Sequence, residues 1–202
     1  MQNNIVSLSK AASESKQKAV LSASILAPQL TIRLGSTPKT SFRGHADIFG
    51  RLVEDHDKHR ALIAMIGETS GASEERKKLF KELVRDIKAH AAAEEQALWS
   101  TVMRNPKTTD QARHAVSEHK ELDDMLADLA ARDMASSGWL RRFNQMKEEY
   151  LHHIKEEEQE QFLAAQKNLT DSEVSEILRL FRVRKQIEKA AAEVEKKIKI
   201  KK

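Results

Sequence analysis

Histidine and carboxylate side chains recur four residues apart in this chain. His90 precedes Glu94, and His153 precedes Glu157 by the same spacing. Residues four apart in a helix leave the same face, so each pair would present an imidazole together with a carboxylate. Imidazoles and carboxylates on the inward faces of a helical bundle are typical of a metal site. The two pairs therefore predict a metal centre inside a bundle.

A third pair and an upstream histidine extend this pattern to four segments. His119 and Asp123 repeat the spacing, and His56 lies in an apolar stripe further upstream. Two assignments stay open, because Asp124 neighbours Asp123 and Glu158 neighbours Glu157. The candidate metal ligands are His56, His90, Glu94, His119, Asp123, His153 and Glu157.

The remaining histidines are weaker candidates on helical geometry. His59 lies about 60° round the helix from His56, so it is an extra ligand, a residue behind the ligands or a surface group. His114 and His152 are turned away from His119 and His153, which predicts surface positions. His45 lies about three turns from His56, too far to share its centre.

The donor types restrict the metal. The chain has no cysteine, which excludes thiolate zinc sites and iron–sulfur clusters. Imidazole with carboxylate suits iron or manganese, and zinc less specifically. Carboxylates pointed into a core are costly unless a cation balances them. Glu94 and Glu157 are the natural candidates to bridge two ions.

The elements that position these residues are predicted to be helices. Charged residues make up 33% of the chain and aromatic residues only 4%, a composition typical of long amphipathic helices. Apolar residues recur at helical spacing in five segments: residues 48–66, 74–102, 112–129, 139–162 and 171–181. Capping boxes are expected at Thr108–Gln111 and Thr170–Glu173. Short breaks between these segments favour an up-down-up-down four-helix bundle with an extra C-terminal helix.

The two ends differ from the bundle. Residues 1–43 hold six basic residues against one acid, Glu14, which predicts a flexible leader, with a secretory signal or organellar transit peptide as alternatives. Residues 44–170 would form the bundle, and residues 171–202 a C-terminal helix with a lysine-rich tail. No apolar run is long enough to span a membrane. The net charge of +4 gives no reason to expect a specific nucleic-acid partner. We expect a cytoplasmic protein.

Four motifs in order resemble the bacterial hemerythrin-like (HHE cation-binding) proteins over about residues 45–170. They are Glu-Asp-His-Asp-Lys-His-Arg-Ala-Leu at 54–62, His-Ala-Ala-Ala-Glu-Glu at 90–95, Ala-Arg-His-Ala-Val-Ser-Glu-His-Lys-Glu-Leu-Asp at 112–123, and His-His-Ile-Lys-Glu-Glu-Glu at 152–158. The resemblance implies a non-haem di-iron centre. By motif, it carries ligand roles to His56, His90, Glu94, His119, His153 and Glu157. At Asp123 the chain departs from the related oxygen carriers, which have a histidine there, and this argues against simple reversible oxygen carriage.

Together, the residues and the resemblance predict a di-iron binding protein that binds, senses or detoxifies dioxygen, peroxide or nitric oxide, or that handles iron. Manganese is the alternative metal. Non-enzymatic ligand binding is favoured, because no nucleophile–base pair or phosphate loop is visible. The alternatives are an oxidase or peroxidase-like enzyme at the same centre, and a metal-free helical scaffold with a basic tail.

Overall fold

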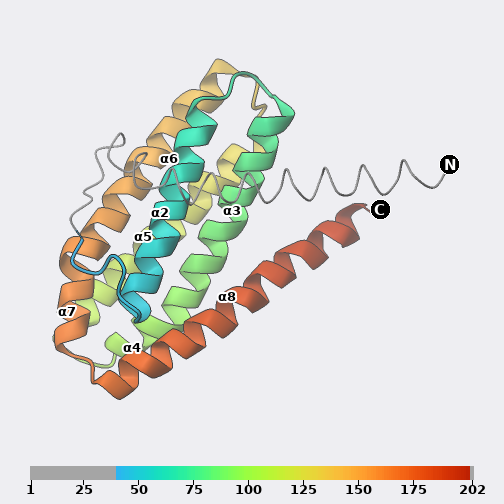
Figure 1. Cartoon of the computed structure of the whole chain (residues 1–202). Coiled ribbons are helices and arrows are strands. Elements are labelled where there is room, and N and C mark those ends of the chain that lie inside the picture. Colours follow the sequence, from blue (N-terminus) through green and yellow to red (C-terminus); the bar gives the residue numbers. More distant parts are fainter. Residues whose placement is uncertain (1–39, 201–202) are drawn as a thin grey trace.

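A computed structural model describes residues 40–200 of the chain, with side chains described as far as residue 192. The described part is helical throughout, and four long helices form an antiparallel bundle that a fifth helix crosses (Figure 1). This confirms the predicted bundle and its extra C-terminal helix. The helices of the bundle and its extension are α2 (Ile48–Gly67), α3 (Glu74–Glu94), α4 (Ser100–Val102), α5 (Thr109–Ala131), α6 (Ser137–Glu156), α7 (Phe162–Lys167) and α8 (Asp171–Ile200).

Capping side chains begin most of these helices. The Ser73 hydroxyl accepts the Arg76 N–H at the start of α3. At the start of α8, Thr170 accepts the Glu173 N–H while Glu173 accepts the Thr170 N–H, so the predicted capping box is present. The box predicted at Thr108 is wrong, although α5 does begin there. The Thr108 hydroxyl donates to the Val102 carbonyl instead, and thereby ties the start of α5 to the end of α4.

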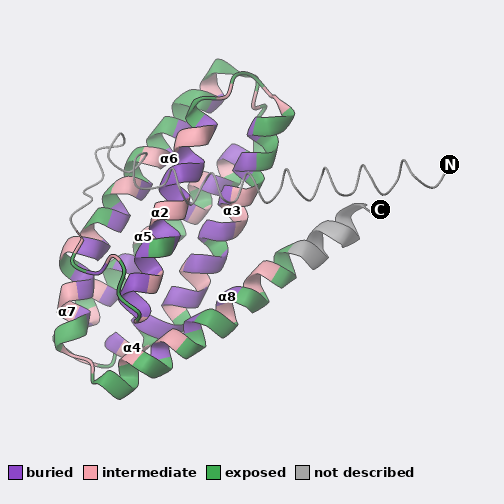
Figure 2. Cartoon of the chain, viewed as in Figure 1, coloured by how far each residue is buried: buried purple, intermediate pink, exposed green. Residues whose placement is uncertain are grey.

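Two apolar clusters fill the two ends of the bundle, as the buried inner faces in Figure 2 show. On α2, Leu52 belongs to one cluster and Leu62 to the other. The same division recurs on α3, where Leu83 lies in the second cluster and Ala97, just beyond the helix, in the first. The residues between these positions occupy the middle of the bundle, and all the predicted ligands except Asp123 fall in that layer. Two packed apolar layers therefore enclose the polar one.

Two turns of π-helix interrupt the bundle helices at equivalent places. One, Glu95–Trp99, joins α3 to α4, and the other, Glu157–Gln161, joins α6 to α7. A π-turn adds a residue to the helical repeat and is found most often at functional sites. The sequence analysis predicted uninterrupted helices here.

Helix α8 packs across α2 and α3 and then continues beyond the bundle (Figure 1). Ile177 and Phe181 anchor it, since both are buried in the first apolar cluster. One turn further on, Lys185 is only 4% exposed. An almost fully buried lysine is unusual, and it requires anionic partners inside the interface.

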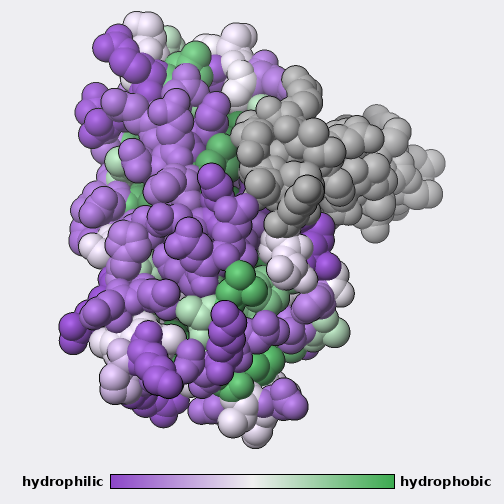
Figure 3. All heavy atoms as spheres, turned by 90° about the vertical axis from the view of Figure 1, so that its left-hand side faces the viewer, coloured by the Kyte–Doolittle hydropathy of each residue, from purple (hydrophilic) through white to green (hydrophobic). Residues whose placement is uncertain are grey.

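Most of the predicted leader lies outside the described residues, but its last four residues pack on the bundle. Phe42 is buried against Phe49 and Phe162, and Arg43 pairs with Asp57 at 2.9 Å. The turn passes so close to α2 that a Cβ on Gly50 would meet the His45 carbonyl oxygen. In the described part of the chain, no helix combines the length and apolar character that crossing a membrane requires. The face in Figure 3 is mainly hydrophilic.

Candidate metal centre

The first half of the centre combines α2 and α3 with the π-turn after α6. The Nε2 atoms of His56 and His90 lie 3.2 Å apart, and Glu157 Oε2 lies 3.3 Å from His56 Nε2. One donor atom from each of these residues falls within 4.8 Å of the others. All three residues are buried, so the group is a metal-sized set of donors inside the bundle.

The second half combines α5 and α6 with the same glutamate. Glu157 Oε1 lies 3.4 Å from His153 Nε2 and 3.7 Å from His119 Nε2. This group also falls within 4.8 Å and is buried. The two oxygens of Glu157 thus face different histidine pairs. A carboxylate in this position can bridge two ions.

Glu94 faces both halves from the opposite side. Its Oε2 lies 3.4 Å from His90 Nε2 and 3.5 Å from His119 Nε2. All four oxygens of Glu94 and Glu157 are buried without a hydrogen-bond partner among the described residues, and so is His119 Nε2. Unsatisfied buried carboxylates are costly unless a cation balances them. These donor atoms therefore fit metal ions held between the two histidine pairs.

Each of the four histidines is held by a carboxylate on its other ring nitrogen. Glu158 and Glu95 contact the Nδ1 atoms of His56 and His119, each at 2.9 Å. The Nδ1 atoms of the other two histidines have their own carboxylates, Asp55 on His90 at 3.2 Å and Glu118 on His153 at 2.9 Å. A carboxylate on Nδ1 fixes the proton there and leaves Nε2 free to bind metal.

These contacts form an internal repeat with an offset of 63 positions. His119 follows His56 by this interval, and His153 follows His90. The two glutamates that face both histidine pairs and all the supporting carboxylates obey the same offset. The corresponding pairs are Asp55 and Glu118, His56 and His119, His90 and His153, Glu94 and Glu157, and Glu95 and Glu158. The supporting carboxylates were not identified as such from the sequence, and this offset is the signal that could have revealed them.

The π-turns explain how consecutive glutamates serve the same centre. Adjacent residues of an α-helix point about 100° apart. Glu94, the last residue of α3, and Glu157, the first residue of the second π-turn, each face both histidine pairs. The next, Glu95 or Glu158, reaches the Nδ1 atom of a histidine on another helix. The sequence left open whether Glu157 or Glu158 faces the centre. Both lie there: Glu157 faces the histidine pairs, and Glu158 contacts His56 Nδ1.

The carboxylates shift the pKa values of the histidines in the metal-free protein. Burial lowers the pKa of His56, but the nearby carboxylates of Glu157 and Glu158 outweigh burial and raise it to about 9. Burial likewise lowers the pKa of His119, and the nearby carboxylates of Glu157 and Glu95 outweigh it and raise the pKa to about 10. Burial raises the pKa of Glu157, yet the neighbouring histidines hold it well below the usual range. Without metal, protonated histidines therefore balance the buried carboxylates at neutral pH.

Buried cations stand behind the first half of the centre. Lys185 of α8 pairs with Asp55 and lies 3.7 Å from Asp86. Arg60, which is fully buried, donates to Glu158 at 2.9 Å. Both carboxylates that hold His56 and His90 thus have their own charged partners.

His59 lies behind His90 rather than at the surface. Its Nδ1 lies 2.5 Å from the Tyr150 hydroxyl, and its ring centroid is 5.4 Å from that of His90. Burial lowers the pKa of His59 to about 3, despite nearby Asp86. It is therefore neutral and supports the layer. His114 and His152 are 58% and 61% exposed, which confirms their predicted surface positions.

The structure does not bring Asp123 into either donor group. Its carboxylate is 43% exposed and pairs with Lys88 at 2.8 Å. Asp123 instead lines a pocket of about 350 Å³ between α3 and α5. His119 and its partner Glu95 line the same pocket, together with the small side chain of Ala92. The pocket therefore leads from the surface to the second half of the centre.

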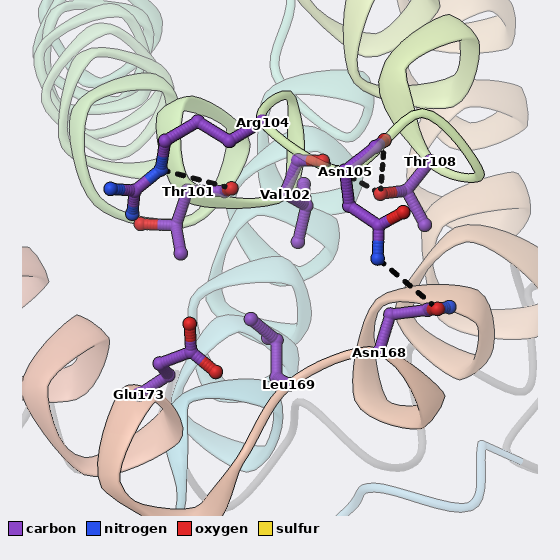
Figure 4. A pocket seen from close by; sticks show the side chains of 8 residues that line it. All are labelled: Thr101, Val102, Arg104, Asn105, Thr108, Asn168, Leu169 and Glu173. Carbon is purple, nitrogen blue, oxygen red and sulfur yellow. Dashed lines mark hydrogen bonds between the residues drawn. The ribbon is translucent and has the colours of Figure 1, made fainter.

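Another pocket, of about 180 Å³, lies at the end of the bundle (Figure 4). The end of α4 and the turn before α8 form it, and Asn105 donates to Asn168 across it at 3.3 Å. None of the donor-group residues lines this pocket.

Comparisons with known proteins establish the family and the fold of the chain. A family model for the hemerythrin HHE cation-binding domain matches residues 47–165. The chain belongs to this family. Among solved structures, the hemerythrin-like domain is similar to a hemerythrin HHE cation-binding domain-containing protein from Mycobacterium kansasii. The TM-score is 0.64 at 24% identity, over 73% of this chain and 90% of the other. No match was found among curated proteins. Residues 171–200, which form α8, lie outside the family model.

Proposed function

We propose that this hemerythrin-like protein holds a dinuclear non-haem iron centre and binds or detoxifies a small oxidant or diatomic molecule there. The observation that carries the proposal is the pair of glutamates, Glu94 and Glu157, whose unpaired oxygens face two histidine pairs. His56 and His90 would hold one ion, and His119 and His153 the other. Iron is preferred because imidazole and carboxylate donors without thiolate suit it, with manganese as the alternative.

The protein's own residues would perform three tasks at such a centre. The Nδ1 partners orient the four imidazoles. The two apolar clusters exclude bulk water from the layer. The pocket beside His119 admits a small molecule from one side. Bound iron would supply an exchangeable coordination position and reversible one-electron redox chemistry.

Access through the pocket supports a role in small-molecule binding. Ala91 and Ala92 form the α3 wall of the pocket, and Lys88 and Lys120 also line it. The carboxylates of Asp123 and Glu95 line the same pocket and balance these two lysines, so the opening carries no excess of either charge. A balanced opening agrees with an uncharged molecule such as dioxygen, peroxide or nitric oxide, and it offers no attraction for iron cations.

Filling the pocket tests the proposal. In iron-loaded protein, Ala92→Leu should leave the iron content unchanged while slowing both azide binding and peroxide consumption. The matched control is Ala127→Leu, on an exposed position of α5. Azide binding is followed by its charge-transfer absorption, and peroxide consumption by oxygen evolution or residual peroxide. Turnover of peroxide would favour the enzymatic alternative, whereas binding without turnover would favour a sensor or binder. Unchanged rates in Ala92→Leu would rule out this pocket as the route.

A further inference from the structure

Two more histidine–glutamate pairs with four-residue spacing lie on the outer surface of the α5–α6 half. His114 precedes Glu118 on α5, and His152 precedes Glu156 on α6. His114 Nε2 lies 3.6 Å from Glu118 Oε1 and 3.5 Å from Glu156 Oε2, and His152 Nε2 lies 3.5 Å from Glu156 Oε1. The antiparallel helices thus bring the two pairs together, so donors from both converge at one place.

The chemistry of this outer group is that of a cation site. Donor atoms of His114, Glu118 and Glu156 lie within 4.8 Å of one another. In the described part of the chain, the ion pairs of both glutamates are with histidines rather than with lysine or arginine. Imidazole nitrogen is the commonest side-chain ligand of protein-bound metal ions. Two imidazoles and two carboxylates suit a divalent first-row transition ion.

One carboxylate of the outer group also contacts the inner centre. Glu118 Oε1 faces His114, while its Oε2 lies 2.9 Å from His153 Nδ1. Glu118 is only 18% exposed, and its two oxygens contact different histidines, one on each side. A cation at the outer group would share this carboxylate with the imidazole of His153. Surface histidine pairs on other helices would have no such connection.

We propose that His114, Glu118 and Glu156, with His152 as a fourth donor, form an outer binding site for one divalent transition-metal ion. The site is separate from the dinuclear centre and does not require it. Where the proposed function also holds, an ion at this position withdraws electron density from Glu118 and weakens its support of His153. Binding of the outer ion would thereby alter the environment of His153 at the inner centre.

Zinc titration of the iron-loaded protein tests the outer site. Isothermal calorimetry with Zn²⁺ should detect one added ion per chain, and an anomalous difference map at the zinc edge should place it beside His114. The His114→Ala and His152→Ala double variant should bind Zn²⁺ about tenfold more weakly or worse, because even partners behind a ligand cost that much. The matched control is His45→Ala, which removes an exposed histidine that lies 3.6 Å from a single carboxylate, Asp47.

The outcomes separate the outer site from the proposed function. Zinc binding that is equal in wild type and the double variant, or lost equally in His45→Ala, would overturn the outer site. A protein that takes up no iron before the titration would contradict the proposed function, while the comparison of variants would still decide on the outer site. Loss of zinc binding in the double variant alone supports it. A shift of the iron charge-transfer band on adding Zn²⁺ to wild type, absent in the double variant, would show the link through Glu118.

Discussion

The two halves of the centre have matching donors but different surroundings. In the α2–α3 half, the carboxylates on the histidines are Asp55 and Glu158, with side chains at most 5% exposed and paired to buried cations. In the α5–α6 half, they are Glu118 and Glu95, which are 18% and 39% exposed. The pocket opens on the second half only, and α8 covers the first.

The difference between the halves shows that binding a metal ion and giving solvent access to it depend on different residues. The repeat of 63 positions gives both halves the same imidazoles and shared carboxylates, so both are equipped to bind an ion. The asymmetry comes from residues that contact no donor group directly, above all Lys185. We infer that the α2–α3 half is the rigid, closed side and that exchange with solvent takes place at the α5–α6 half.

The largest loss of metal affinity is expected from a substitution at the point where the two halves meet. Glu157→Gln removes a negative charge that both histidine pairs face, so metal affinity should fall by at least about 100-fold, more than the loss of a partner behind a ligand. Metal content after dialysis against a weak chelator measures this. Glu160→Gln, on an exposed position of the same π-turn, should retain wild-type content. Loss from one half only would mean that Glu157 is not shared.

Removing the cation behind the closed half should have the next largest effect. Lys185→Met removes the lysine that Asp55 and Asp86 share, while Arg51 still pairs with Asp55 and Lys58 with Asp86, so the free energy of unfolding should fall by about 1–3 kcal/mol. The control is Lys120→Met on the open side. Lys120 pairs with Asp124 at the surface, and its loss should cost less than about 1 kcal/mol. Urea unfolding of both metal-free variants gives the comparison, and equal losses would contradict the assignment of a closed half.

The carboxylates on Nδ1 should differ between the halves to a smaller degree. Asp55→Asn and Glu95→Gln each disturb one imidazole, and losses of about 10- to 100-fold in metal affinity are expected. Asp55→Asn should lie at the upper end, because it also takes from buried Lys185 the nearer of its two carboxylates, whereas solvent can replace Glu95. Iron release to a chelator ranks the two variants. Faster iron release from Glu95→Gln than from Asp55→Asn would contradict the assignment of the α2–α3 half as the closed side.

The smallest effect concerns pH and applies to both halves equally. His56 and His119 have pKa values of about 9 and 10 in the metal-free fold. Raised pKa values stabilise the fold fully below the unfolded value of about 6.5, and this stabilisation is lost as pH rises through 9 and 10. Metal-free protein should therefore melt at a lower temperature at pH 10 than at pH 7. Iron-loaded protein should show less change, because its histidines are neutral in both conditions.

Sequence periodicity was sufficient to predict the fold and the inward positions of the histidines. The apolar stripe around His56 and the four-residue spacing of His90 and Glu94 are local, and a regular helix converts them directly into a face. The π-turns were not predictable in this way, because they depend on packing at the centre. They bring Glu95 and Glu158 to imidazoles on other helices.

Contacts between distant segments account for the remaining differences between the predictions from sequence and the structure. The position of Asp123 on its helix gave no indication that Lys88 of a neighbouring helix would pair with it. Lys185 lies where the apolar pattern of the last helix fades, so local periodicity gave no reason to expect its burial. It is buried because Asp55 and Asp86, which lie 130 and 99 residues earlier in the chain, provide the charges that it needs.

The central claim is that two irons share Glu94 and Glu157, and Mössbauer spectroscopy of protein reconstituted with ⁵⁷Fe²⁺ under anaerobic conditions and then oxidised tests it most directly. If both ions share these glutamates, we expect two irons per chain by metal analysis and a magnetically coupled diferric pair that gives no electron paramagnetic resonance signal. One iron per chain, or two ferric ions with independent paramagnetic signals, would contradict it.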